Sequence, residues 1–335
     1  MIKNFEEIQR DLKNKEFAPV YFLYGEEPYY IDAISDYIQD FVLSESERAF
    51  NQTVIYGKES STGNILEHAM RFPMMAQYNV IILKEAQEIK NLDEFTSYFK
   101  QPNPSTIVVF CCKRTKLDKR TVIYKTLKDS EYCLVMESPK VQDYKITGWI
   151  ESIVKSKDFK ITNKASALLS EYLGNDLSKI TNEIEKLFKI KHESKTIDLD
   201  DIEKHIGISK EYNIFELQNA LGAKNSAKTA MICKYIEANP KSNPFVLISS
   251  SIFNFFSRLY ILESTSKSLI ETGSKLGMQE WQLKSYYPAL KNYKGKIENV
   301  LELIQEYDLK SKGINDSGTN VGTLTKELIF RILMI

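Results

Sequence analysis

Residues 20–29 read VYFLYGEEPY, an apolar run rich in aromatic side chains that ends in a glycine, two acids and a proline. Such a run predicts a buried strand, a turn and the start of a helix. Short runs of the same kind occur at residues 53–56, 80–84, 107–112 and 133–136. Their composition is typical of strands that are covered on both faces.

Helical patterns separate these runs, at residues 29–41, 62–71, 92–99 and 119–127. Strands that alternate with helices of this length predict a parallel sheet of about five strands in an α/β domain. Ser138 and Pro139 mark its expected end, near residue 140.

After residue 140 we expect helices and no further strands. Short helices are predicted at residues 143–155, 163–173, 176–189 and 198–206, with Thr162 and Asp198 as N-caps. Further helices are predicted at 226–238, 245–262, 279–293, 296–310 and 324–334. The sequence therefore predicts an α/β domain at 1–140, a small helical domain at 141–211 and an all-helical domain at 212–335.

The composition is that of an ordinary globular protein. Of 335 residues, 43% are hydrophobic and 27% are charged, which excludes wholesale disorder. The 45 basic and 45 acidic side chains cancel, so no global field favours nucleic acid or membrane. The longest apolar run has six residues, whereas a membrane span needs about 20. The four cysteines form no CxxC pair. We therefore expect a soluble, reduced, cytoplasmic protein with no membrane partner.

The turn at residues 25–28 lacks the features of a nucleotide site. A phosphate-binding loop needs several glycines and a lysine, but this turn has Gly25 alone, followed by Glu26 and Glu27. The sequence also lacks a GxSxG elbow and an HExxH pair. We expect no catalytic residue, no cofactor and no metal. An α/β enzyme whose site is assembled from scattered residues stays an alternative.

Residues 68–76 read HAMRFPMMA and form a possible protein-binding segment. Pro73 disfavours helix at Phe72, so the preceding helix should end there and leave apolar side chains at a helix end and loop. Methionine suits such surfaces because its side chain is flexible and polarisable. The candidates are Met70, Phe72, Met74 and Met75. The alternative is that they cap the α/β core.

Two basic segments are candidates for contact with nucleic acid. Residues 113–128 carry seven basic side chains and one acid, and residues 281–296 carry four lysines, four aromatics and no acid. Cations that follow the backbone and rings that stack on bases are typical of single-strand binding. The alternatives are a solvated surface for the first segment, and for the second a helix that buries Trp281 and Tyr287. The candidate residues are Lys113, Arg114, Lys119, Arg120, Trp281, Lys284 and Lys291.

Several of these segments, in this order and spacing, resemble one family along nearly the whole chain: the delta subunit of the bacterial DNA polymerase III clamp loader. The resemblance rests on VYFLYGEEP at residue 20, RFPMM at 71, VIILKEA at 80, KLDKRT at 116, GNDLSKI at 174, NEIEKL at 182 and FEL at 215.

The resemblance implies an AAA+-like α/β domain without a functional P-loop, a helical lid domain and an all-α collar domain that joins the loader subunits. It implies no ATPase activity of its own, within a DNA polymerase (nucleotidyltransferase) holoenzyme. It also implies an apolar wedge that enters the beta sliding clamp and favours the opened ring. That wedge matches Phe72 and Met74, where the family often has Leu and Phe, with Met70 as support.

The implied partners are the beta sliding clamp, the gamma/tau and delta-prime loader subunits, and primed DNA. Trp281 is similar to an aromatic residue near the primer–template junction, and residues 113–128 face either DNA or a neighbouring subunit. Another ATPase-like scaffold such as delta-prime is the further alternative. That family typically has zinc-binding cysteines, and this chain has none at the required spacing.

Overall fold

The computed structural model describes residues 1–335 apart from 191–194, 210–211, 241–242, 266–267, 279 and 315–319. The described chain forms two compact units, Met1–Val141 and Gln142–Ile335. A division of the second unit between residues 211 and 212 stays a prediction.

The first unit is built on a five-stranded sheet in the order β2-β3-β4-β1-β5, and every neighbouring pair is parallel. This confirms the predicted sheet. The strands are β1 (Val20–Gly25), β2 (Gln52–Tyr56), β3 (Asn79–Lys84), β4 (Thr106–Lys113) and β5 (Cys133–Ser138).

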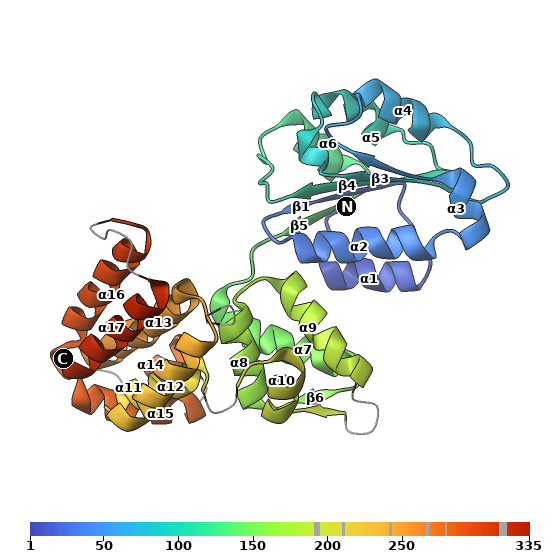
Figure 1. Cartoon of the computed structure of the whole chain (residues 1–335). Helices are drawn as coiled ribbons and strands as arrows, with labels where there is room; N and C mark the ends of the chain where they lie inside the picture. Colours follow the sequence, from blue (N-terminus) through green and yellow to red (C-terminus); the bar gives the residue numbers. More distant parts are fainter. Residues whose placement is uncertain (191–194, 210–211, 241–242, 266–267, 279, 315–319) are drawn as a thin grey trace. The chain divides into compact units, whose positions relative to one another are not determined.

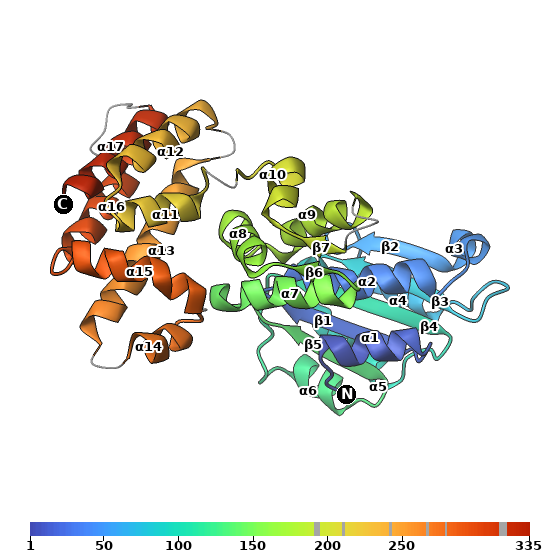
Figure 2. The same ribbon diagram turned by 90° about the horizontal axis from the view of Figure 1, so that it is seen from below.

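Helices cover both faces of this sheet (Figures 1 and 2). One face carries α1 (Phe5–Lys13) and α2 (Pro28–Phe41), and α3 (Glu45–Asn51) leads from them into β2. The other face carries α4 (Thr62–Met70), α5 (Thr96–Lys100) and α6 (Val122–Asp129), with single turns at η1 (Ala86–Glu88) and η2 (Leu92–Phe95).

The alternation of side chains along each strand supplies two separate cores. In β1, Tyr21 and Leu23 pack toward α1 and α2, whereas Phe22 and Tyr24 pack toward α4, α5 and α6. All four side chains are buried, as expected for a strand that is covered on both faces.

The second unit begins with a small helical region that also contains two strands. Its elements are η3 (Asp143–Lys145), α7 (Ile146–Ser156), β6 (Lys160–Ile161), α8 (Asn163–Leu173), α9 (Leu177–Ile190), β7 (Thr196–Ile197) and α10 (Leu199–Ile206). Strands β6 and β7 pair in parallel. The prediction that no strand follows residue 140 is therefore wrong. Each strand has two residues, which is too short to show an alternating pattern.

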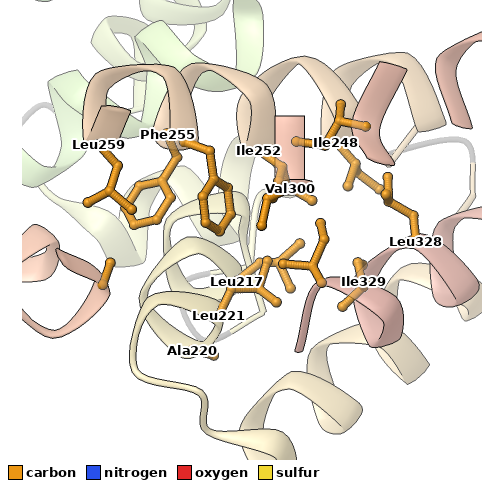
Figure 3. Close-up of a cluster of buried hydrophobic side chains, with 14 of the residues drawn as sticks. Leu217, Ala220, Leu221, Ile248, Ile252, Phe255, Leu259, Val300, Leu328 and Ile329 are labelled. Atoms are coloured by element: carbon orange, nitrogen blue, oxygen red, sulfur yellow. The ribbon is translucent and has the colours of Figure 1, made fainter. Parts of the chain in front are cut away.

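The rest of the second unit is helical. Its elements are α11 (Ile214–Gly222), α12 (Ser226–Ala238), α13 (Phe245–Ser264), α14 (Leu269–Lys275), α15 (Glu280–Asn292), α16 (Ile297–Ser311) and α17 (Val321–Met334). Figure 3 shows Ile252 and Phe255 of α13 above Leu217 and Leu221 of α11, with Val300 and Leu328 beside them.

Among the described helices, α13 alone is long and apolar enough to cross a membrane by length and composition, and half of its most apolar window is buried within the protein. Its buried side chains include Ile248, Ile252, Phe255 and Leu259. Helix α13 therefore acts as the central core helix of this region.

Candidate functional site

The parallel sheet of the first unit has two edges with different chemistry. All five strands end at the carboxyl edge, where the loops after β1 and β4 carry charged side chains. All five strands begin at the amino edge, where the loop between α4 and β3 carries apolar side chains.

The carboxyl edge contains the place where open α/β sheets usually bind ligands. Strands β1 and β4 are neighbours, but α2 follows β1 on one face and α6 follows β4 on the other. Ligands bind outside the carboxyl ends of strands at such a switch point. Here two ion pairs join its sides: Lys113 Nζ lies 2.6 Å from Asp32 Oδ1, and Lys116 Nζ lies 3.5 Å from Glu26 Oε2.

The turn from β1 into α2 uses its polar groups internally. The Glu27 carboxylate accepts a hydrogen bond from the Tyr29 N–H at 3.1 Å and thereby caps α2. A helix N-terminus is where a phosphate would bind, because its N–H groups and dipole favour an anion. The Glu27 N–H donates to the Ser138 carbonyl at 3.0 Å, and the Ser138 hydroxyl donates to the Glu27 carbonyl at 2.7 Å. The turn is therefore tied to β5.

Two further lysines of this edge are also paired. Lys119 Nζ donates to Glu137 Oε2 at 3.0 Å, and this bond raises the pKa of Lys119. Burial tends to lower the pKa of Lys84, but its 2.9 Å bond to Asp36 and that charge outweigh burial and raise it. Both lysines thus stay charged and neutralise acidic neighbours.

Metal-ligating groups do not gather in the described part of the chain: no cluster of three or more His, Cys, Asp and Glu side chains suits a metal ion there. The four cysteines are free and buried. Burial raises the pKa of Cys111 and of Cys233 to about 11.

The amino edge carries the predicted apolar segment, which we call the apolar loop and define as residues 70–75. Helix α4 ends at Met70 and the backbone is extended at Arg71, as Pro73 had suggested. The exposed fractions are 59% for Met70, 83% for Phe72, 63% for Met74 and 101% for Met75. The alternative that these side chains cap the core is therefore wrong.

Asn51 fixes the backbone of this loop. Its side chain lies at the end of α3 and is 2% exposed. Its Oδ1 accepts from the Met74 N–H at 2.6 Å, and its Nδ2 donates to the Met74 carbonyl at 2.9 Å. Figure 1 shows α3 and the chain between α4 and β3 at the same end of the sheet.

Two more asparagines hold the end of α4. Asn79 Nδ2 donates to the His68 carbonyl at 3.0 Å, and Asn103 Nδ2 reaches the Ala69 and Arg71 carbonyls, each at 3.4 Å. The last carbonyls of a helix have no helical N–H partner, and these amides bind three of them. The His68 carbonyl also accepts from the Arg71 N–H at 3.3 Å. Sequence reasoning missed all three asparagines.

The predicted basic residues of the carboxyl edge lie on one exposed segment. Arg114, Lys119 and Arg120 are exposed, whereas Lys113 is partly buried. Arg120 binds Asp118 at 2.9 Å, and its hydrogen bonds lower the pKa of that carboxyl. With Lys113 and Lys119 also paired, much of the positive charge of this segment is compensated by acids of the same unit.

The second basic segment forms α15 and the turn after it. Lys284 and Lys291 are exposed, as is Tyr287 at its outer face. Tyr286 and Tyr293 are buried instead, because they share a stripe with Leu283 at helical spacing. The alternative that this helix buries Tyr287 is therefore wrong. The side chain of Trp281 lies outside the described residues.

Comparison with known proteins gives one family. Residues 21–138 match the model of the family "DNA polymerase III, delta subunit". DNA polymerase III subunit delta of Bacillus subtilis (strain 168) is 28% identical over 236 residues, which are 68% of this chain and 67% of that protein. The probable DNA polymerase III subunit delta of Aquifex aeolicus (strain VF5) is 23% identical over 313 residues, 88% of this chain and 86% of that protein.

The fold agrees with these relatives. The solved structure of the Bacillus subtilis DNA clamp loader delta protein has a TM-score of 0.59 and 23% identity, and the match covers 99% of this chain and 100% of that one. The residues that the family model covers include the sheet with its carboxyl edge and the apolar loop. The family model, the relatives and the fold together support the delta subunit of DNA polymerase III as the family that this chain resembles.

Proposed function

We propose that this delta subunit binds the beta sliding clamp through the apolar loop and favours the opened ring for loading onto primed DNA. The observation that carries the proposal is the exposure of Phe72, Met74 and Met75 on a loop whose backbone is held by hydrogen bonds. Large apolar side chains that project together from a monomer surface are typical of a protein-binding site. Burial of each is worth about 1.5–3 kcal/mol.

The loop acts on the ring by differential affinity. A ligand shifts a conformational equilibrium only by the difference between its affinities for the two states. A loop that fits the clamp better when the ring is open therefore favours opening without a chemical step. The opening energy comes from contact between apolar side chains and the clamp.

The carboxyl edge supports a subunit that does not use ATP itself. The Glu27 carboxylate lies where a phosphate would bind, and the Lys113–Asp32 and Lys116–Glu26 pairs join the sides of the crevice. Partner subunits of the gamma/tau and delta-prime type would then supply ATP-dependent control of when the loop meets the clamp. We place this assembly in the bacterial cytoplasm, and assign contacts between subunits to the helices of residues 212–335.

We assign contact with primed DNA to α15 in preference to the basic segment at residues 113–128. Lys284, Lys291 and Tyr287 are exposed on α15. In contrast, Lys113, Lys119 and Arg120 are paired with acids of their own unit. Exposed lysines beside an exposed ring are suited to a phosphate backbone and its bases.

Surface plasmon resonance on immobilised clamp tests the proposal, with no nucleotide present. We expect the wild-type chain to bind, and Phe72→Ala with Met74→Ala to weaken binding at least tenfold, since truncation of central apolar contacts typically costs about 2 kcal/mol or more. Val122→Ala is the matched control, because Val122 is also apolar and 66% exposed but begins α6, after β4.

The outcomes are distinct. Loss of binding in the double variant, with the control unchanged, supports the apolar loop as the clamp site. Full binding by a folded double variant contradicts that assignment. Absence of binding by the folded wild-type chain contradicts the proposed function as a whole and returns attention to an α/β enzyme with a dispersed site.

A further inference from the structure

We propose that Asn51 is a positioning residue that holds the apolar loop in its clamp-binding shape, with Asn79 and Asn103 as supports. The inference rests on the proposed function, because it concerns how the same loop meets the clamp. None of the three side chains needs to touch the partner. Their role follows from the backbone groups that they bind.

The Asn51 amide imitates a neighbouring peptide group. Both its oxygen and its nitrogen bind the main chain of Met74, at 2.6 and 2.9 Å, and its nitrogen also donates to the Glu47 carbonyl at 3.0 Å. An amide has two donors and two acceptor sites, so three of the four are used. Because Asn51 is buried and bonded to α3 on one side, it fixes Met74 relative to the sheet.

The other end of the loop is held by different amides. Asn79 binds the His68 carbonyl, and Asn103 binds the Ala69 and Arg71 carbonyls. Asn79 is the first residue of β3, and Asn103 comes three residues before β4. Each asparagine therefore lies close to where a strand begins, and the loop is tied to three neighbouring strands of one sheet.

These bonds oppose the collapse of the loop. Apolar side chains on an untethered loop would fold back onto the protein or fluctuate, and a partner would then have to order them. Here Met74 is fixed through its backbone while its side chain stays exposed. Met75 adopts a left-handed conformation at φ 52°, which a non-glycine residue keeps only when its surroundings determine it.

Amide hydrogen exchange tests the geometry without the clamp. The Met74 N–H lies in an exposed loop, but its bond to Asn51 should slow its exchange at least tenfold relative to Asn51→Ala. Asn64→Ala is the matched control, since Asn64 is an exposed asparagine near the start of α4, whereas the apolar loop follows the other end of that helix. Equal exchange of Met74 in Asn51→Ala and wild type would overturn the inference.

Clamp affinity tests the consequence. We expect Asn51→Ala to weaken binding about tenfold, because loop residues must then be ordered on association. Asn103→Ala, at a partly exposed site, should weaken it about twofold to threefold and guards against a folding defect at Asn51. For this comparison the chain is immobilised and the clamp is the analyte, so a loss of folded protein lowers the maximal response, whereas a positioning role changes the dissociation constant.

A double-mutant cycle with Met74→Ala separates the two roles further. If Asn51 acts through Met74, Asn51→Ala should cost less in the Met74→Ala background than in wild type. Equal costs in both backgrounds, or a folded Asn51→Ala that binds within twofold of wild type, would overturn the inference. If the folded wild-type chain fails to bind the clamp, the proposed function fails first, and the exchange result still reports whether Asn51 holds the loop.

Discussion

Gly25 packs so closely on Ser138 that a β-carbon at residue 25 would lie 2.0 Å from the Ser138 carbonyl oxygen. Gly25 also has φ 148°, a conformation that side chains rarely adopt. These two residues end β1 and β5, and in the turn into α2 the Glu27 N–H donates to the same Ser138 carbonyl. The glycine therefore serves close packing between main chains at the carboxyl edge, where a phosphate-binding loop would need open space.

Gly25→Ala should lower the stability of the first unit by about 3 kcal/mol or more, because both the contact and the backbone conformation become strained. Chemical denaturation followed by circular dichroism measures this. Gly63→Ala is the control, since Gly63 lies in α4 with only the Ser61 hydroxyl at 4.0 Å. That variant should be neutral or stabilise by up to about 1 kcal/mol. A harmless Gly25→Ala would contradict the described contact.

Glu27→Ala should lower the stability of the same unit by about 1 kcal/mol, because α2 loses the carboxylate that caps it. The melting temperature of the variant measures this loss of stability.

Millimolar Mg–ATP should leave the melting temperature of the wild-type chain unchanged, since a ligand that binds the native state raises it. A rise of the melting temperature with Mg–ATP would show that the carboxyl edge binds nucleotide despite its ion pairs.

Lys284→Ala with Lys291→Ala should reduce the salt dependence of primed-DNA binding by the assembled loader. Removal of two phosphate contacts lowers the slope of log affinity against log salt by about 1.8 for duplex DNA. Fluorescence anisotropy at several salt concentrations measures the slope. Lys119→Ala, which removes a lysine paired with Glu137, is the comparison and should change the slope less. A larger change of slope in Lys119→Ala than in the double lysine variant would instead assign DNA contact to residues 113–128.

Alkaline pH should lower the free energy of unfolding of the second unit because of the buried Cys233 thiol. Burial raises the pKa of this thiol from 9.0 to about 11, so the folded state keeps its proton where the unfolded state loses it. The resulting stability is fully present below about pH 9 and is lost as pH rises toward 11.

Cys233→Ala removes this contribution to the pH dependence of stability. The difference in melting temperature between wild type and Cys233→Ala should therefore shrink by about 4 °C between pH 8 and pH 10.5. Tyrosines also titrate in this range, but both proteins contain the same ones, so their contribution cancels in the difference of melting temperatures. A difference that stays constant with pH would mean that the Cys233 thiol is not shielded as described.

Local patterns were sufficient to predict the sheet. Buried parallel strands are continuously apolar, and the five runs differ from β1–β5 by one or two residues at their ends. The helix predicted over residues 163–173 is confirmed. Its ends were visible in the sequence because Thr162 caps it and Gly174 ends it. Helices α1, α3, α11 and α14 have 7 to 9 residues each, and sequence analysis did not list them, since so few turns give a weak periodic signal.

The apolar loop was predicted, but the means by which it is held was not. Pro73 and the methionines are visible in one stretch of sequence. In contrast, Asn51 and Met74 are separated by 23 residues, and Asn103 and Arg71 by 32. An asparagine beside a strand is an ordinary turn residue in sequence. Only the order of β2, β3 and β4 in the sheet brings these amides to one loop.

The exposed thioethers of the apolar loop make it sensitive to oxidation. Peroxide converts methionine to a polar sulfoxide, and the sulfoxide oxygen disrupts an apolar contact. Met70, Met74 and Met75 are open to the reagent, whereas Met136 in β5 is 1% exposed and protected by the core. Mild peroxide should therefore abolish binding through the apolar loop while the protein stays folded. Methionine sulfoxide reductase should restore that binding.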